Sequence, residues 1–432
     1  MIYLYIFIMF VIAFISLYVF KDVLSPAFIF CLPWILSLMG LTMSNYPYST
    51  ESFAYAYIVL GAIVFITGFV LAMANAKLKK RYIESKEFYY FKPCIIKLLI
   101  IFEIIITVYL YYVNYLYVRS HFIVSIYQSL RHGLTTETLV IPGYLMYARS
   151  IITIISVCVV IIYFNIHETQ KKFFQKVMIV QLILAALNLM TVMTRNGILI
   201  ATLPLFITFL VCKNFDNRKI IKYAIRFLIV FLVFFSVIAI MKNAYLNQYG
   251  SNSELLVNQF SLYMSGSLVA LEKFIESSND YLYGQNTFRF FYGIINRLFG
   301  TGHVQQLVQD PISIDGENGT NVYTFYQYYI KDFGMIYALI VQFFVGILHG
   351  VLYRMMLSKK PINIFYFSIM VYPLVMQFFE DQYISLLSTW IQYFLVGWVF
   401  FRTNLFVFRG KNTGQISRKN NSIYKARSIS SK

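Results

Sequence analysis

Long apolar runs follow one another along almost the whole chain, separated by short polar connections. Most of them have about 17–25 residues, enough for a helix to cross a hydrocarbon core of roughly 30 Å. The runs lack the alternation of apolar and polar positions that barrel strands show, so the sequence predicts an all-α polytopic membrane protein with about eleven transmembrane helices. The predicted spans are 2–20, 25–44, 53–75, 95–118, 143–164, 177–193, 197–212, 226–241, 334–353, 362–378 and 386–405.

One long stretch, residues 242–323, interrupts this series of runs. Apolar residues recur in it at helical spacing, first over 255–275 and again over 288–298. This periodicity predicts short amphipathic helices that lie along the membrane interface or cap the bundle. The chain therefore divides into an N-terminal bundle of about eight helices (1–241), one large extracytoplasmic loop (242–323), C-terminal transmembrane helices (324–408) and a basic, disordered cytoplasmic tail (409–432).

Composition agrees with this division and excludes an ordinary soluble domain. The chain is 59% hydrophobic and 12% charged, and its mean hydropathy is +0.67. The first run has no basic residue before it and no small-residue cleavage pattern after it, so we expect a retained helix. All four cysteines lie in spans or at their ends, which indicates buried thiols without a disulfide framework or metal spacing. No nucleotide-binding loop is present, and we predict no cofactor and no metal.

The net charge of +18 reflects membrane topology. Basic residues gather in the short loops that fall on one side when the spans are counted, and the positive-inside rule makes that side cytoplasmic. The N-terminus is then outside, the C-terminus is cytoplasmic, and no nucleic acid partner is expected. Nine of the 36 Lys and Arg residues fall outside: Arg119, Arg131, Arg149, Arg195, Lys242, Lys273, Arg289, Arg297 and Lys331.

Several external polar residues are candidates for chemistry. Arg195 lies in a hairpin between two apolar runs, where its guanidinium needs a carboxylate, backbone carbonyls or a lipid phosphate as partner. Glu103 lies inside a span and has a neighbouring helix as an alternative partner, and Glu380 and Asp381 close a short external hairpin. His303 is a candidate general base or a polar surface residue. Asp315, Glu317, Tyr323, Lys331 and Asp332 lie at the polar approach to a span, and the last two also fit a structural ion pair.

Three tracts taken in order resemble the bacterial O-antigen and capsule repeat-unit polymerases, the Wzy-type membrane enzymes. They are 193–199 (MTRNGIL), 263–274 (YMSGSLVALEKF) followed by 284–289 (GQNTFR), and 321–324 (NVYT) leading into 332–334 (DFG). The spacing from Arg289 to Gly300 also matches an Arg-x10-Gly pattern of external loops in that family. With the late large loop, the similarity of topology covers nearly the whole chain.

The resemblance implies a metal-independent glycosyltransferase in the bacterial cytoplasmic (inner) membrane. It would transfer a growing glycan from undecaprenyl diphosphate to a sugar hydroxyl of an incoming lipid-linked repeat at the outer face. Membrane lipids, a chain-length regulator and a flippase of the same pathway would be its partners. Arg195 and Arg289, then Arg131, Arg149 and Arg297, would bind the diphosphate. Glu317, Asp315 and His303 would assist the hydroxyl, and Lys331, Asp332, Tyr323 and Arg119 are further site candidates.

Three other functions remain open from the sequence, one of which is a non-catalytic assembly partner of the polysaccharide machinery. An O-antigen ligase-like transferase would use the same carrier and similar chemistry. A flippase for lipid-linked oligosaccharide would place basic residues along an intramembrane cavity, whereas nearly all of these lie at span ends.

Overall fold

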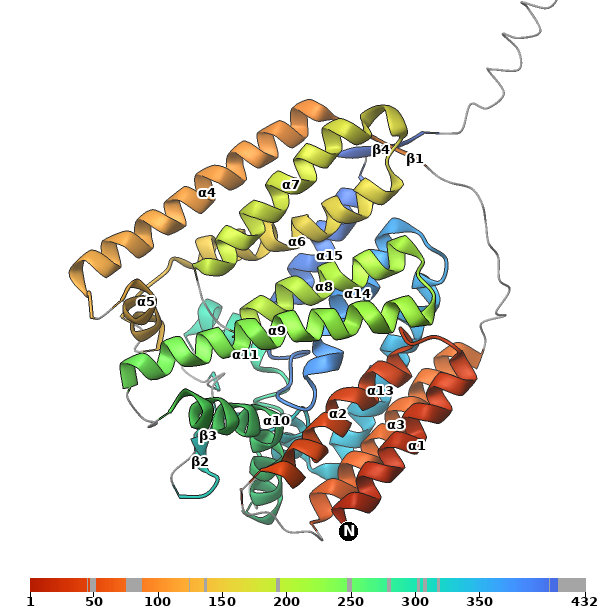
Figure 1. The fold of residues 1–432 in the computed structure, drawn as a ribbon, viewed down its shortest axis with the longest axis vertical. Coiled ribbons are helices and arrows are strands. Elements are labelled where there is room, and N and C mark those ends of the chain that lie inside the picture. The colour runs from red at the N-terminus through yellow and green to blue at the C-terminus, as the bar shows by residue number, and fades with distance from the viewer. Residues whose placement is uncertain are drawn as a thin grey trace, which may run out of the picture.

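The computed structural model describes residues 1–44, 46, 52–74, 88–123, 125–135, 138–191, 195–246, 251–277, 281–300, 304–305, 309–316, 319–403 and 405–410. Within these ranges the protein is a bundle of helices (Figure 1). Nine of the described helices are long and apolar enough to cross a membrane. They are α1 (Ile2–Phe20), α2 (Pro26–Met43), α3 (Phe53–Ala74), α4 (Pro93–Ser120), α6 (Gly143–Asn165), α7 (Glu168–Met190), α8 (Arg195–Lys213), α9 (Asn217–Leu246) and α13 (Met335–Met356).

Two of the eleven predicted spans correspond to shorter helices. α14 (Pro361–Met376) and α15 (Leu387–Arg402) have 16 residues each. α14 is apolar and almost entirely buried, and it packs against α8, α13, α2 and α6. By length and composition, nine helices of the described chain are thus candidates to span a membrane. α14 is a shorter apolar helix in addition to these nine.

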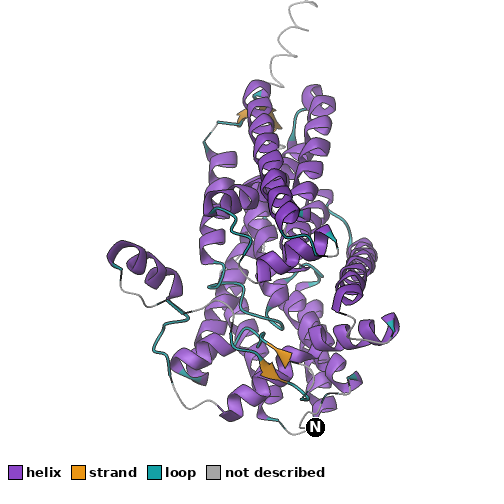
Figure 2. Cartoon of the chain, turned by 90° about the vertical axis from the view of Figure 1, so that its left-hand side faces the viewer, coloured by secondary structure: helices purple, strands orange, loops and turns teal. Residues whose placement is uncertain are grey.

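The remaining elements lie at the two ends of the bundle. α5 (Ile126–Thr135), α10 (Asn252–Ser277), α11 (Arg289–Phe299), α12 (Gln327–Phe333) and the strand pair β2 (Ile312–Ser313) and β3 (Gly319–Thr320) gather at one end, here called the α10 end (Figure 1). At the opposite end, the β1 end, β1 (Phe88–Phe91) pairs antiparallel with β4 (Val407–Gly410). Figure 2 shows the two small strand pairs at opposite ends of the helical body. Residues 409 and 410 close β4, and the rest of the predicted tail, 411–432, lies outside the described residues.

The large loop differs from the prediction in its first helix. α10 has 26 residues and is longer than the short helices predicted, and Leu268 to Leu271 on it are fully buried in the core. It packs on α2, where the Ser37 hydroxyl donates to the Met264 carbonyl. Lys273, one of the cations predicted to be external, donates to the carbonyls of Ser313 and Ile314 at 2.9 and 2.8 Å. That lysine therefore fastens β2 to α10.

α11 agrees with the predicted amphipathic character. None of its residues is buried, and Leu298 on its apolar face is 70% exposed. The helix ends at Gly300, whose φ of +67° is in the left-handed region that glycine adopts without steric cost.

Glycines bring α3 and α13 into close backbone contact. A Cβ built on Gly346 would overlap the Phe65 carbonyl oxygen, and one on Gly68 would overlap the carbonyl oxygen of Phe343. Gly350 faces the Cβ of Ala72, which would lie 2.6 Å away from an added methyl group. Small residues at such spacing allow membrane helices to approach closely and gain dispersion energy over a long contact.

We predict that Gly346→Leu destabilises the protein by about 1–3 kcal/mol or more, because the side chain can fit only if α3 and α13 move apart. The measurement is the midpoint of thermal unfolding of the detergent-purified protein. Gly143→Leu is the matched control, since no atom lies within 4 Å of a Cβ at that position. Equal midpoints for the two variants would contradict the close packing of α3 on α13.

Candidate functional site

Asp332 fastens the segment before α11 to α12. Its carboxylate is fully buried and accepts from the backbone and side-chain nitrogens of Asn286 at 3.2 and 3.0 Å and from the Thr287 nitrogen at 2.6 Å. The Leu282 nitrogen adds a bond to the Lys331 carbonyl at 2.9 Å. The predicted alternative of a Lys331–Asp332 ion pair is wrong, because the only ion pair among the described residues joins Lys171 to Glu168. Asp332 instead positions the start of α11 and with it Arg289.

A second buried aspartate shapes the connection between α14 and α15. We call residues 379–386 the acidic turn. Asp381 is 1% exposed and accepts from the backbone nitrogens of Tyr383, Ile384 and Ser385, each at 3.1 Å. The hydroxyl of Tyr329 on α12 donates to the same carboxylate at 3.1 Å. These bonds fix the turn and attach it to α12.

Glu380, the neighbour of Asp381, lies in a polar network of its own. Gln382 Nε2 donates to its carboxylate at 3.0 Å, and the hydroxyl of Tyr328 is a further hydrogen-bond partner. Burial, together with the charge of Asp381, raises the pKa of Glu380 to about 7. Burial raises the pKa of Asp381 to about 6, opposed by its backbone and Tyr329 hydrogen bonds. Asp381 therefore ionises first, and Glu380 exchanges a proton near neutral pH.

An open cavity of about 300 Å³ lies between α11 and the start of α15. Arg289 and Arg297 line it from α11, Ser385 and Ser388 line it from the acidic turn and α15, and Tyr147 closes it from α6. A narrow cleft adjoins it and shares Arg289 and Ser385 with it. That cleft reaches the buried side chains of Tyr328, Tyr329 and Asp381, so cationic and acidic groups meet in one place.

Arg289 is held at this junction by its own hydrogen bond. Its Nε donates to the Gln305 carbonyl at 2.6 Å, which leaves the two terminal nitrogens of the guanidinium for another partner. Burial lowers the pKa of the guanidinium, and the neighbouring Tyr328 opposes this effect. Tyr328 also lies within electrostatic range of Glu380 and Asp381. Tyr328 therefore interacts electrostatically with Arg289 and with both acidic residues.

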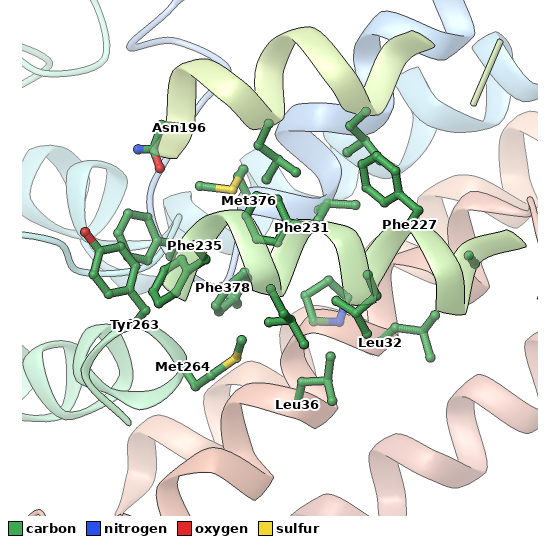
Figure 3. A pocket seen from close by; sticks show the side chains of 18 of the residues that line it. Leu32, Leu36, Asn196, Phe227, Phe231, Phe235, Tyr263, Met264, Met376 and Phe378 are labelled. Carbon is green, nitrogen blue, oxygen red and sulfur yellow. The ribbon is translucent and has the colours of Figure 1, made fainter. Parts of the chain in front are cut away.

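An apolar groove of about 310 Å³ runs along the side of the bundle between α2, α8, α9, α10 and the end of α14 (Figure 3). Leu36, Phe231, Phe235 and Met264 are among the side chains that line it. Asn196, at the start of α8, is its only amide and lies at the α10 end. Phe379 also lines the groove and directly precedes Glu380, so the groove leads to the acidic turn.

The structure places the other predicted site residues at different positions. Arg149 lies on α6 beside Tyr393 of α15, and its Nη1 is buried without a hydrogen-bond partner in the described chain. The hydroxyl of Tyr323 donates to the Asp310 carbonyl at 2.8 Å, and Asp315 is exposed beside the β2–β3 pair. Arg119 is exposed at the end of α4. None of these four residues lines the cavity beside α11.

Four predicted residues cannot be placed by their side chains. Glu317 and His303 lie outside the described residues. Arg195 begins α8 and Arg131 lies within α5, and their side chains are outside the described part of the structure.

The acidic turn and its tyrosines were not among the predicted site residues. A signal was present, because two adjacent carboxylates directly after an apolar run are costly in a membrane protein unless the fold uses them. The described chain contains no group of three His, Cys, Asp or Glu side chains suited to a metal ion. No protein-family model, curated protein or solved structure matches this chain.

The raised pKa values predict that stability falls as pH rises. A carboxyl group that binds its proton more tightly in the folded state stabilises the protein fully below the unfolded pKa and loses that contribution as pH passes the folded value. For Glu380 this window runs from 4.5 to about 7, which corresponds to about 3 kcal/mol. For Asp381 it ends earlier, at about 6.

We therefore expect Glu380→Gln to reduce the fall of the unfolding midpoint with pH between 4.5 and about 7, because the variant lacks a carboxyl group that binds its proton more tightly in the folded state. The midpoint is measured in detergent at a series of pH values. Glu168→Gln is the control, because Glu168 lies exposed beside Lys171 and its loss should leave the slope unchanged. The same slope in Glu380→Gln as in the unaltered protein would contradict the buried, proton-binding carboxyl.

Proposed function

We propose that this protein polymerises lipid-diphosphate-linked oligosaccharide repeats, as a Wzy-type O-antigen or capsule polymerase does. The observation that carries the proposal is that Arg289 and Arg297 line one open cavity with Ser385 of the acidic turn, and that Arg289 also lines the adjoining cleft, which reaches Asp381. Arginines suit a diphosphate, and a carboxyl group that exchanges a proton near neutral pH suits an attacking hydroxyl. The family resemblance of the sequence supports the same assignment.

In this proposal the α10 end faces the outside of the bacterial cytoplasmic membrane. The basic residues near the β1 end, among them Arg218, Lys219, Lys359 and Lys360, then face the cytoplasm in accord with the positive-inside rule. α14 and α15 become the tenth and eleventh spans, with the N-terminus outside and the C-terminus inside. Loop 242–323 then forms the outer part of the catalytic site.

The arginines would stabilise the leaving group. As the bond between the sugar C1 and the diphosphate oxygen breaks, that oxygen keeps the electron pair and negative charge develops on it. Arg289, held through its Nε by Gln305, presents its terminal nitrogens in a fixed orientation. Arg297 lies two turns along the same helix and lines the same cavity. Such preorganised donors lower the barrier because they need no reorganisation during the reaction.

Glu380 replaces Glu317, Asp315 and His303 as our first choice for the general base. The acceptor sugar hydroxyl would form the new C1–O bond while its proton passes to the Glu380 carboxylate. A pKa of about 7 leaves a large fraction of this group ionised at neutral pH and keeps it basic enough to take the proton. Asp381, fixed by three backbone nitrogens, would be a positioning residue that holds the turn and favours the protonated form of Glu380 after transfer.

The groove would hold the polyprenyl tail of a carrier lipid. A flexible isoprenoid chain requires an apolar channel that reaches the membrane, and the groove lining is apolar apart from Asn196 and the hydroxyl of Tyr263. Its α10 end lies beside Phe379, so a tail in the groove would bring its diphosphate toward the acidic turn. A flippase would need polar groups along such a path for its glycan, and this lining favours a transferase.

Deletion of the gene should leave single repeat units on the cell surface and remove long chains, as seen on polysaccharide gels. Complementation with Arg289→Ala or Glu380→Gln should leave at least about a hundredfold fewer long chains, the loss typical of a missing charge stabiliser or general base. Repeats trapped inside the deletion strain would indicate a flippase. Long carrier-linked chains that never reach their acceptor would indicate a ligase.

The control for complementation is Arg218→Ala, which removes an exposed arginine at the β1 end and should restore normal chains. Protein abundance in membranes is measured by immunoblotting for every variant. Polysaccharide chains of normal length in both Arg289→Ala and Glu380→Gln would contradict the assignment of these residues to the active site.

We predict that Leu36→Trp, which fills part of the groove from α2, lowers the amount of long chains several-fold at unchanged protein abundance. The enlarged side chain would compete with the lipid tail for the same space. Leu395→Trp is the matched control, because Leu395 on α15 is likewise exposed (57%, against 47% for Leu36) and does not line the groove. An unchanged chain distribution in Leu36→Trp would argue against the groove as the lipid site.

A further inference from the structure

A second buried polar cluster lies between α4 and α7, apart from the acidic turn. Six polar side chains line the interface of these two helices, all at most 5% exposed, although most of α4 is apolar and faces outward. We call this set the polar ladder: Glu103, Thr107 and Asn114 on α4, with Gln181 and Asn188 on α7 and Thr191 at the C-cap of α7.

Short hydrogen bonds connect the ladder along its length. Asn188 Nδ2 donates to Thr107 Oγ1 at 2.8 Å, and the Thr107 hydroxyl donates to the carbonyl of Glu103 at 2.7 Å. Farther along, Asn114 Nδ2 donates to the Thr191 carbonyl at 3.3 Å. The Thr191 hydroxyl donates a hydrogen bond to the Asn188 carbonyl at 2.6 Å. The two helices are thereby joined at successive turns.

The buried atoms of the ladder that lack a hydrogen-bond partner are all oxygens. They are both carboxyl oxygens of Glu103 and the side-chain oxygens of Asn114 and Asn188, judged against the described chain. An ionised carboxylate without a partner is among the most costly groups to bury in a membrane. Buried acceptor oxygens without partners are stabilised by positive charge or by a hydrogen-bond donor. Protonation of Glu103 neutralises its carboxylate and adds one O–H donor.

No charged side chain of the described structure compensates Glu103 from the surrounding helices. Lys97 on α4 and Lys176 on α7 are exposed, and Arg149 on α6 lies beside Tyr393 of α15. Gln181 faces Glu103 from α7 and is a side-chain hydrogen-bond partner of its carboxyl, while its Nε2 also donates to the Ile152 carbonyl of α6 at 3.4 Å, but this neutral amide supplies no positive charge. Neutralisation by an internal ion pair is therefore not built into this site.

The ladder leads from Glu103 toward the α10 end. Asn114 is followed one turn later by Tyr117, whose ring stacks on His121 with centroids 4.6 Å apart. The hydroxyl of Tyr117 bonds to Thr138 at 2.7 Å, and His121 is exposed. Polar groups thus continue from the buried carboxyl to the surface at the same end as the candidate active site.

We propose that Glu103 is a reversible proton-binding site within the membrane, connected through the polar ladder to the aqueous phase at the α10 end. One proton from that phase binds one carboxylate oxygen and leaves a neutral carboxylic acid, with no other bond made or broken. The proton is the ligand because it alone neutralises the group while adding a donor for the neighbouring amide oxygens. This site is independent of the proposed polymerase function.

The test is labelling with dicyclohexylcarbodiimide, an apolar reagent that reacts with protonated carboxyl groups, on the purified full-length protein. The acid adds its oxygen to the carbodiimide carbon and its proton to nitrogen, and peptide mass spectrometry locates the adduct. We expect at least tenfold more label on Glu103 than on the exposed Glu168. Labelling of Glu103 should fall as pH rises, and saturating Na⁺ should leave it unchanged.

Glu103→Gln should remove the adduct from the α4 peptide and keep the size-exclusion profile of the unaltered protein. Labelling of Glu103 no higher than that of Glu168 at acidic pH would overturn the proposal. So would pH-independent labelling, which would mean that the group does not exchange a proton. Protection by Na⁺ would replace the proton with a metal cation as ligand and would also refute it. The first arm uses the unaltered protein, so a folding defect in the variant cannot hide the answer.

Discussion

The hydrogen bonds of two buried aspartates underlie the geometry at the α10 end. Asp332 gathers the nitrogens of Asn286 and Thr287, and Asp381 gathers three consecutive nitrogens of the acidic turn. Each carboxylate has enough donors to offset much of its desolvation, and each fixes a segment that would otherwise have several conformations. Since α12 carries Asp332 and also Tyr329, one short helix holds both walls of the cavity.

This arrangement separates two kinds of charged group. Asp332 and Lys273 form hydrogen bonds mainly to backbone groups of other segments and hold those segments in place. Arg289 and Arg297 line the cavity, and the Nε of Arg289 is its only guanidinium nitrogen with a hydrogen bond to the described chain, so its terminal nitrogens are available to another partner. The polar ladder of α4 and α7 adds a third kind, in which a carboxyl group is enclosed without an ionic partner. Residue type alone does not distinguish these roles, because each depends on which backbone groups lie within reach.

The hydrophobic pattern predicted the spanning helices well because apolar length is a local property of the chain. Seven of the nine long helices begin within about three residues of the predicted start, whereas α7 and α9 extend about nine residues farther at their beginnings, where basic residues had been taken for loops. α10 was predicted as a short helix at the interface or over the bundle, because its periodicity does not reveal that α2 covers it. In the site, Arg289 and Arg297 were predicted from charge and position. Glu380 and Tyr328 were not, because their proximity results from the packing of α12 on the acidic turn, which no local pattern encodes.

The contact between α3 and α13 has a consequence for biosynthesis. Gly68 enters the membrane early, yet its partners Phe343 and Ile347 follow only after most of the chain has been made. Until α13 has been synthesised and inserted, the glycine-lined face of α3 is therefore in contact with lipid or with another helix. β1 likewise pairs with β4, which follows the last helix α15 in the chain. The bundle closes only when its C-terminal helices insert, so a ribosome that stops before α13 would leave a set of inserted but unassembled helices.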